Sequence, residues 1–288
     1  MPHSTISSPS SEEQPATQVQ APPVNVRPME TLAELRTCVA LQQEIWGAEF
    51  DEIVPASLML AAHHVDALAL GAYGPDETLV GFVFGLTGLK DGEVAHWSHM
   101  LGVKPGARDQ GIGRRLKEVQ REILSCRGIK RMYWTFDPLQ ARNAHLNINR
   151  LGVRVVEYVT DMYGTSQSPL HHAVGTDRLV VECLTDGNGH EAAPRANGHT
   201  ARGHVLTAFP REEPPAAGQK PVLALIEIPW DLQAVVADSA RIANEWRSAT
   251  RGYFQWALAN GYRVTGVRRD AEARRVFFVL ERVQSTDG

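Results

Sequence analysis

The sequence predicts a mixed α/β (α+β) fold, and three observations support that class. Segments with the apolar period of a helix alternate with short runs of β-branched and aromatic residues along most of the chain. Hydrophobic residues make up 43% of the 288 residues, which is enough for a substantial core. A glycine-rich turn also joins one predicted strand to a long amphipathic helix.

Two helices are predicted near the start. Thr31 and Glu34 have the spacing of a capping box, and apolar residues recur at near-helical spacing after them. A second helix is predicted from Pro55 to Val65. Further on, helices are predicted at 113–126 and 143–152, and strands at 67–73, 78–86, 93–103, 130–136, 153–159 and 177–184.

The last part of the sequence predicts a strand, a helix and two strands. The strand covers 222–228, the helix covers about 235–259, and the segments RVTGVRR and RVFFVLER form the final strands. Three tryptophans, Trp230, Trp246 and Trp256, occur here. They pack in a core, or alternatively they form the wall of a pocket for a bulky or apolar ligand.

Composition divides the chain into four parts. Residues 1–23 are rich in Ser, Pro, Gln and Glu, which predicts a disordered tail. Residues 24–185 form the first domain, and residues 221–283 form a C-terminal α/β subdomain. Residues 186–220 are rich in Gly, Ala, Pro and Asn, which predicts a flexible loop or linker.

Charge and cysteine usage exclude several classes of protein. A formal net charge of −4 argues against a nucleic-acid partner. No run of 18 apolar residues is present, so we expect no membrane span. The three cysteines are far apart and form no C-x-x-C pair, which argues against a disulfide framework or a zinc site. We therefore expect a cytoplasmic protein without a metal ion, and a homodimer is compatible with the sequence.

The glycine-rich turn between the strand at 93–103 and the next helix has the features of an anion site. Gly111 and Gly113 lack a Cβ, so the backbone can approach a ligand closely. The unpaired N–H groups and the dipole of the helix then favour phosphate groups. Leu116 stands where a dinucleotide fingerprint needs a third glycine, and no G-K-[ST] sequence follows, so both common nucleotide motifs are absent.

These residues resemble the GNAT N-acetyltransferase superfamily. Arg108-x-x-Gly111-x-Gly113 matches its [Q/R]-x-x-G-x-[G/A] motif, and 101–105 matches the strand and loop that precede it. The order of elements from about 25 to 160 is similar as well, so the expected fold is a central mixed, mostly antiparallel sheet flanked by helices. An uncharacterised bacterial subgroup is similar in further segments, which here are Phe136–Leu139, Asn143-Ala144, Asn147 and Glu227–Gln233.

The resemblance implies acetyl-CoA or another acyl-CoA as co-substrate. Its pyrophosphate would bind the backbone amides at about 109–114, and its pantetheine arm would add to the backbone of Leu101 and Val103 like a strand. Asn143 either contacts the pantetheine arm or only caps its helix. The residues implied for coenzyme A are Leu101, Val103, Arg108, Asp109, Gln110, Gly111, Ile112, Gly113, Arg114 and Asn143.

The candidates for proton transfer are histidines and tyrosines. His96 and His99 lie on one predicted strand, and a period of two places them on opposite faces, so at most one faces the cleft. Many members of the family carry a tyrosine four residues before the glycine that ends the last helix, but Ile148 stands there. The alternative proton donors are Tyr133, Tyr158 and Tyr163, and Tyr158 is the one we select.

The function expected from the resemblance is direct transfer of an acetyl or succinyl group from coenzyme A to the amine of a small molecule. The alternative is a catalytically inactive module that binds acyl-CoA and regulates another protein. The missing tyrosine at Ile148 supports this alternative. It does not decide the question, because water can protonate a thiolate.

Overall fold

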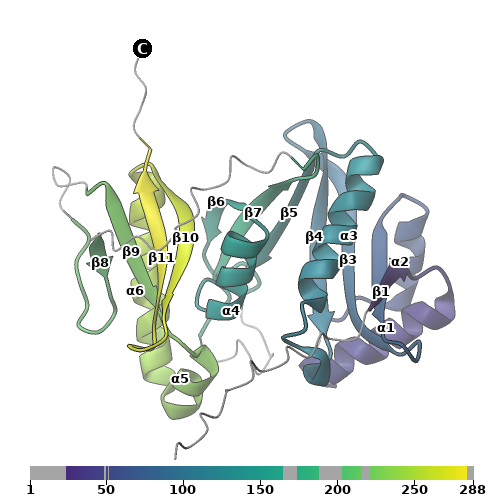
Figure 1. Cartoon of the computed structure of the whole chain (residues 1–288), viewed down its shortest axis with the longest axis horizontal. Helices are drawn as coiled ribbons and strands as arrows, with labels where there is room; N and C mark the ends of the chain where they lie inside the picture. The colour runs from purple at the N-terminus through teal and green to yellow at the C-terminus, as the bar shows by residue number, and fades with distance from the viewer. Residues whose placement is uncertain are drawn as a thin grey trace, which may run out of the picture.

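The computed structural model describes residues 24–48, 50, 52–164, 174–187, 203–215 and 221–283. The tail predicted at 1–23 lies outside these residues, as do 188–202 and 216–220 of the predicted linker. The described residues form a mixed α/β structure with two sheets that stand side by side (Figure 1). The predicted fold class is confirmed.

The larger sheet has seven strands in the order β1-β2-β3-β4-β5-β7-β6. Every neighbouring pair is antiparallel except β4 with β5, which is parallel. The sheet is therefore mixed and mostly antiparallel. Its strands are β1 (Asn25–Pro28), β2 (Leu68–Tyr73), β3 (Leu79–Lys90), β4 (Glu93–Val103), β5 (Arg131–Phe136), β6 (Arg154–Val159) and β7 (Arg178–Leu184).

Helices cover both faces of this sheet. α1 (Leu32–Trp46) and α2 (Ala56–His63) pack on one face of β2 and β3, in a cluster that includes Phe82 and Phe84. α3 (Ile112–Cys126) packs on the opposite face, in a cluster that includes Val83. The short α4 (Ala141–Ala144) continues into a π-helical turn, η2 (His145–Arg150), beside β7 (Figure 1).

The start of α1 has the capping box that the sequence predicts. The Thr31 hydroxyl accepts a hydrogen bond from the Glu34 amide at 3.2 Å, and the Thr31 amide donates to the Glu34 carboxylate at 3.0 Å. Arg27 of β1 also donates to that carboxylate, and this contact holds the pKa of Glu34 down to about 2. The capping box therefore also links α1 to the edge of the sheet.

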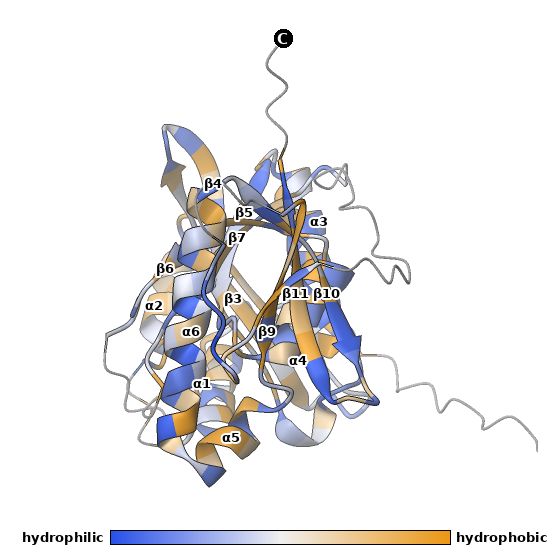
Figure 2. Cartoon of the chain, turned by 90° about the vertical axis from the view of Figure 1, so that its left-hand side faces the viewer, coloured by the Kyte–Doolittle hydropathy of each residue, from blue (hydrophilic) through white to orange (hydrophobic). Residues whose placement is uncertain are grey.

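The smaller sheet has the order β10-β11-β9-β8. Its strands are β8 (His204–Leu206), β9 (Leu223–Ile228), β10 (Tyr262–Asp270) and β11 (Arg275–Arg282). β8 lies inside the segment predicted as a linker and pairs in parallel with β9. Figure 2 shows that β9 and β11 are apolar over most of their length, as expected for the central strands of a packed sheet.

The helix predicted at about 235–259 is two helices, so that prediction is wrong. α5 (Leu232–Asp238) ends at Ser239, whose backbone is extended, and α6 (Ala240–Ala259) begins directly after it. The Ser239 side chain caps α6 by accepting from the Ile242 amide at 3.3 Å. A serine competes with helical hydrogen bonding through its hydroxyl, which explains the break.

One core joins the two sheets. A single cluster of buried residues includes Trp134 of β5, Val181 of β7, Phe254 of α6 and Phe278 of β11. The three tryptophans of the C-terminal part, Trp230, Trp246 and Trp256, pack against this same cluster. All three are partly buried, and each contributes its buried part to this core.

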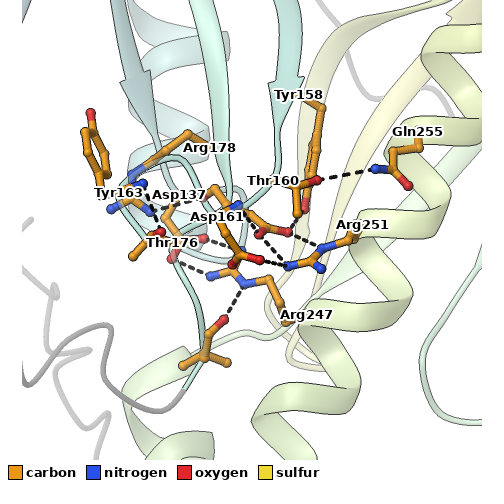
Figure 3. Close-up of polar contacts among 12 residues, drawn as sticks. Asp137, Tyr158, Thr160, Asp161, Tyr163, Thr176, Arg178, Arg247, Arg251 and Gln255 are labelled. Atoms are coloured by element: carbon orange, nitrogen blue, oxygen red, sulfur yellow. Dashed lines mark hydrogen bonds and ion pairs between the residues drawn. The ribbon is translucent and has the colours of Figure 1, made fainter. Parts of the chain in front are cut away.

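Charged side chains fix the contact between α6 and the larger sheet (Figure 3). Arg247 donates two hydrogen bonds to the Asp137 carboxylate, at 2.9 and 2.8 Å, and a third to the carbonyl of Val174. Arg251 binds Asp177 in the same manner, at 2.9 and 2.7 Å. Asp137 also accepts from the Leu139 amide, so it shapes the turn after β5 as well.

All three cysteines, Cys38, Cys126 and Cys183, are free thiols. No helix among the described residues has both the length and the apolar composition that crossing a bilayer requires.

Candidate active site

The parallel strands β4 and β5 form a fork. They are paired only at His96 with Met132 and at Trp97 with Tyr133. Beyond these two pairs, residues 98–103 of β4 have no strand partner on the side of β5 among the described residues. A strand edge that lacks a partner presents N–H and C=O groups to an extended ligand. We call the position just beyond the last pair, where Ser98 and Trp134 begin the two arms, the fork.

A β-bulge lies at the fork. Phe84 of β3 is paired with Met100, whereas the next residue, Gly85, is paired with Ser98. His99 is therefore the extra residue of β4, which bends the strand locally. The bulge explains why β4 turns away from β5 at this point.

The N-terminus of α3 lies at the end of the open arm of β4. Gly111 is the N-cap residue, with φ of +77°, a left-handed conformation that suits glycine. The amides of 109–114 donate to no acceptor within the described part of the chain. A Cβ at Gly111 would meet nothing within 4 Å, so the space on that side of Gly111 is open. Free amides and the helix dipole together favour an anion here.

Side chains of the loop tie it to its surroundings. The Arg108 guanidinium donates to the Val103 carbonyl at 3.3 Å, and Gln110 donates to the Gly106 carbonyl at 3.5 Å. Asp109 of the loop pairs with Arg142 of α4 at 3.1 Å, and this contact links the loop before α3 to α4. The predicted cofactor residues 108–114 and the edge of β4 at 101–103 thus lie together in one place.

Two further sequence expectations concern α4. Asn143 is not the N-cap, because the helix begins at Ala141 and Gln140 holds that position. Its side chain is exposed. Ile148, which stands where many members of the family carry a tyrosine, is buried in the main core. This position of η2 therefore supplies no tyrosine hydroxyl.

His96 is fully buried in a polar network between β4 and α3. Its ring nitrogens lie 3.1 Å from the Thr87 hydroxyl and 3.1 Å from Nε2 of Gln120. Burial, assisted by the nearby Lys117 charge, lowers the pKa of His96 to about 3. The ring is therefore neutral, and both of its nitrogens are engaged within the chain, although His96 is also among the residues that line a pocket beside the last β4–β5 pair.

Lys117 occupies the fork itself. Its Nζ donates to the Ser98 hydroxyl at 2.7 Å and lies 3.9 Å from the centre of the Trp134 ring. Ser98 in turn donates to Gln120 at 2.7 Å. Burial lowers the pKa of Lys117 to about 7. The sequence analysis missed these residues, although Lys117 and Gln120 interrupt the apolar stripe of an amphipathic helix, which is the signal for them.

His99 differs from His96 in exposure and surroundings. Its ring packs edge-on against Phe84 with centroids 6.5 Å apart, and the residue remains exposed. Neighbouring groups partly desolvate the imidazole and lower its pKa, so the ring is neutral near pH 7. The two histidines contact opposite layers of the domain. His96 contacts α3, whereas His99 packs on the cluster that includes α1 and α2.

Tyr158 lies on β6, which β5 and β7 separate from β4. Its hydroxyl donates to Asp177 at 2.6 Å, and its ring stacks on Phe254 of α6. The structure thus separates Tyr158 from the fork, because its strand is at the far edge of the sheet. Burial and the Asp177 hydrogen bond also raise its pKa strongly, which opposes proton release.

The other two tyrosines lie nearer the fork. The Tyr133 hydroxyl donates to Glu182 at 2.6 Å, and the Tyr163 hydroxyl lies 3.2 Å from that of Thr135 on β5. A pocket of about 320 Å³ begins at the last β4–β5 pair; its lining includes Thr87, Trp97 and Tyr133. Within the described ranges, no group of three or more His, Cys, Asp or Glu residues gathers as a metal site.

Comparison with known proteins finds similarity to acetyltransferases. The model of the acetyltransferase (GNAT) family matches residues 35–152. Similar solved structures include the ribosomal-protein-S18-alanine N-acetyltransferase from Escherichia coli, which is 16% identical, with a TM-score of 0.45 and coverage of 56% of this chain and 94% of that chain. The acetyltransferase of GNAT family from Streptococcus pneumoniae is 15% identical, with a TM-score of 0.45 and coverage of 56% and 99%. No curated protein matches significantly.

Proposed function

We propose that the chain, whose residues 35–152 match the model of the acetyltransferase (GNAT) family, transfers an acetyl or succinyl group from coenzyme A to the amine of a small molecule. Acyl-CoA is the co-substrate that the family implies. The single observation that carries the proposal is the continuity of the open β4 edge with the free amides of α3.

The residues at this place fit coenzyme A in charge and in shape. Six successive amides at 109–114 suit the pyrophosphate, and the open space at Gly111 admits it. We propose that the amide groups of the pantetheine arm bind the backbone of Leu101 and Val103, on the edge of β4 that has no strand partner among the described residues; the Val103 carbonyl there also accepts from Arg108. The exposed Asn143 on α4 is proposed as a second contact for that arm.

In the proposed reaction, His99 accepts the proton of the attacking amine. Its exposure at the bulge and its neutral ring support this role, because a general base must be accessible and unprotonated before it accepts a proton. His96 supports the strand through its buried network and has no direct role. Tyr158 is not retained as a proton donor, because its hydroxyl is committed to Asp177 on another strand.

The pocket beside the last β4–β5 pair supports an acceptor of small size. Its volume of about 320 Å³ lies at the lower end of the range for small-molecule sites. Trp97 and Tyr133 supply an apolar lining, and the Lys90 ammonium lies 5.5 Å from the Tyr133 ring centre. An amine with a compact apolar body suits this lining.

Calorimetric titration with coenzyme A tests the cofactor site. We expect Gly111→Trp to weaken binding by at least about 100-fold, because the indole fills the phosphate position. Gly128→Trp is the matched control, since Gly128 follows the other end of α3 with φ of +74° and an equally open environment. Equal affinity of the two variants would contradict the proposed site.

Release of free coenzyme A tests the reaction. Acetyl-CoA and succinyl-CoA are each incubated with a panel of small amines and, in parallel, with peptides that carry free N-termini or lysines. Amine-dependent thiol release with a small amine supports the proposal, and release only with peptides contradicts the small-molecule acceptor. Binding without any release would favour the inactive acyl-CoA-binding module, which the buried Ile148 supports.

A further inference from the structure

We propose that Lys117 is a catalytic residue that protonates the sulfur of coenzyme A as the thioester bond breaks. This inference rests on the proposed function, because it requires acyl-CoA along the open edge of β4. It assigns a proton donor where η2 offers none at Ile148, which is an aliphatic residue buried in the core.

The position of the ammonium group supports this role. Ser98 and Trp134 are the first residues of β4 and β5 beyond their last pair, and Nζ of Lys117 contacts both. A pantetheine arm that begins at the amides of α3 and follows β4 inward reaches the fork at its thiol end. Lys117 lies one helical turn beyond Gly113 on the face of α3 that packs on the sheet.

Lys117 donates a hydrogen bond to the side chain of Ser98. Ser98 donates its own proton to Gln120, so its oxygen accepts from Lys117. The further Lys117 protons point to no carboxylate in the described parts of the chain. A buried cation without a counter-ion is costly unless an anion arrives.

The titratable groups that face Lys117 carry no compensating charge. Cys183 of β7 is a buried thiol whose pKa burial raises, and His96 of β4 is a buried neutral imidazole. Burial also lowers the pKa of Lys117 to about 7, so the amine can both give and regain a proton near neutral pH. A thiolate formed at the fork would supply the missing anion.

The chemical step balances without another reactant. The amine nitrogen of the acceptor forms a bond to the carbonyl carbon, and the carbon–sulfur bond then breaks with its electron pair left on sulfur. Lys117 gives its proton to that sulfur and becomes neutral. The proton that the attacking nitrogen loses passes to His99 and solvent, and solvent returns one proton to Lys117.

The test uses coenzyme A itself and needs no acceptor. Ultraviolet absorbance of the thiolate follows the titration of coenzyme A bound to the full-length protein across pH. In the wild type we expect the thiol pKa to fall by about 1–3 units relative to free coenzyme A, because a cation lies beside the sulfur. Lys117→Met removes the charge at similar volume and should return the thiol pKa to its free value.

Each outcome separates the two proposals. Lys130→Met, at an exposed lysine just before β5, is the matched control and should keep the wild-type shift. If coenzyme A binds and its thiol pKa is the same in wild type and Lys117→Met, the role of Lys117 is refuted while the cofactor site stands. If coenzyme A does not bind the wild type, the result contradicts the proposed function, and with it the role of Lys117 that depends on it. Calorimetry on each variant confirms that binding itself is retained.

Discussion

Two buried cations of this chain lie in opposite surroundings. Arg247 of α6 is only 4% exposed and meets the Asp137 carboxylate with two parallel hydrogen bonds. Lys117 of α3 is 7% exposed and contacts a hydroxyl and an indole ring instead. Burial acts to lower the pKa of both. For Arg247 the carboxylate outweighs burial and the pKa is raised, whereas for Lys117 burial prevails.

The difference separates two regions of the molecule: the contact of the two sheets, where the charges are paired within the chain, and the fork, where we propose that a ligand binds. At the contact of the two sheets, Arg247 and Arg251 have their carboxylate partners within the chain, so nothing further is needed there (Figure 3). At the fork, the buried Lys117 ammonium contacts a hydroxyl and an indole ring but no carboxylate among the described residues, and the open edge of β4 and the six amides of 109–114 next to it lack hydrogen-bond partners there. Unsatisfied polar groups in such number support the proposed binding site.

The largest effect on stability is expected from breaking the paired cation. Arg247→Met removes two charge-assisted hydrogen bonds from the buried Asp137 carboxylate, which should lower the free energy of unfolding in urea by about 3–5 kcal/mol. Arg241→Met, on the exposed face of the same helix, should change it by less than about 0.5 kcal/mol. A loss below about 1 kcal/mol for Arg247→Met would show that this pair does not hold the two sheets together.

A smaller, pH-dependent effect on stability is expected from Lys117, the buried cation that has no carboxylate partner among the described residues. Below about pH 7 the lysine is protonated in both states, and its burial penalty is fully present. Above that pH the folded state loses the proton first, while the unfolded lysine keeps it up to about 10.5. The unfolded state then binds more protons, so stability rises with pH, by up to about 1.4 kcal/mol per unit from this group.

The variant Lys117→Met isolates the contribution of Lys117 to the change of stability with pH. The difference in unfolding free energy between wild type and Lys117→Met, measured in urea at several pH values from 6 to 10 or so, should change in favour of the wild type as pH rises. Lys130→Met serves as the exposed control and should show no such trend. A difference that is flat with pH would mean that Lys117 titrates at its ordinary pKa.

Local signals explain why the glycine-rich turn before α3 was predictable from sequence. Gly111 and Gly113 mark a turn that opens a helix, and the capping box at Thr31 and Glu34 marks the start of another. In both cases the interacting residues are close in sequence. The order of elements in the first domain followed from the same kind of signal.

Contacts between distant residues explain what the sequence did not show. Asp137 and Arg247 are 110 residues apart, and Ser98 meets Lys117 only because α3 packs on β4. The bulge at His99 depends on the pairing of β4 with β3, which no local pattern reveals. Tyr158 was chosen for its chemistry, and only the strand order shows that it lies at the far edge of the sheet.

The most direct measurement of the central claim is amide hydrogen exchange with and without coenzyme A. Saturating coenzyme A should slow exchange at residues 109–114 and along 98–103, because ligand oxygens and the pantetheine arm then accept and donate hydrogen bonds there. Exchange around Gly128, at the other end of α3, should stay unchanged. If coenzyme A binds and protects other segments while 109–114 exchange as before, the account of this site is wrong.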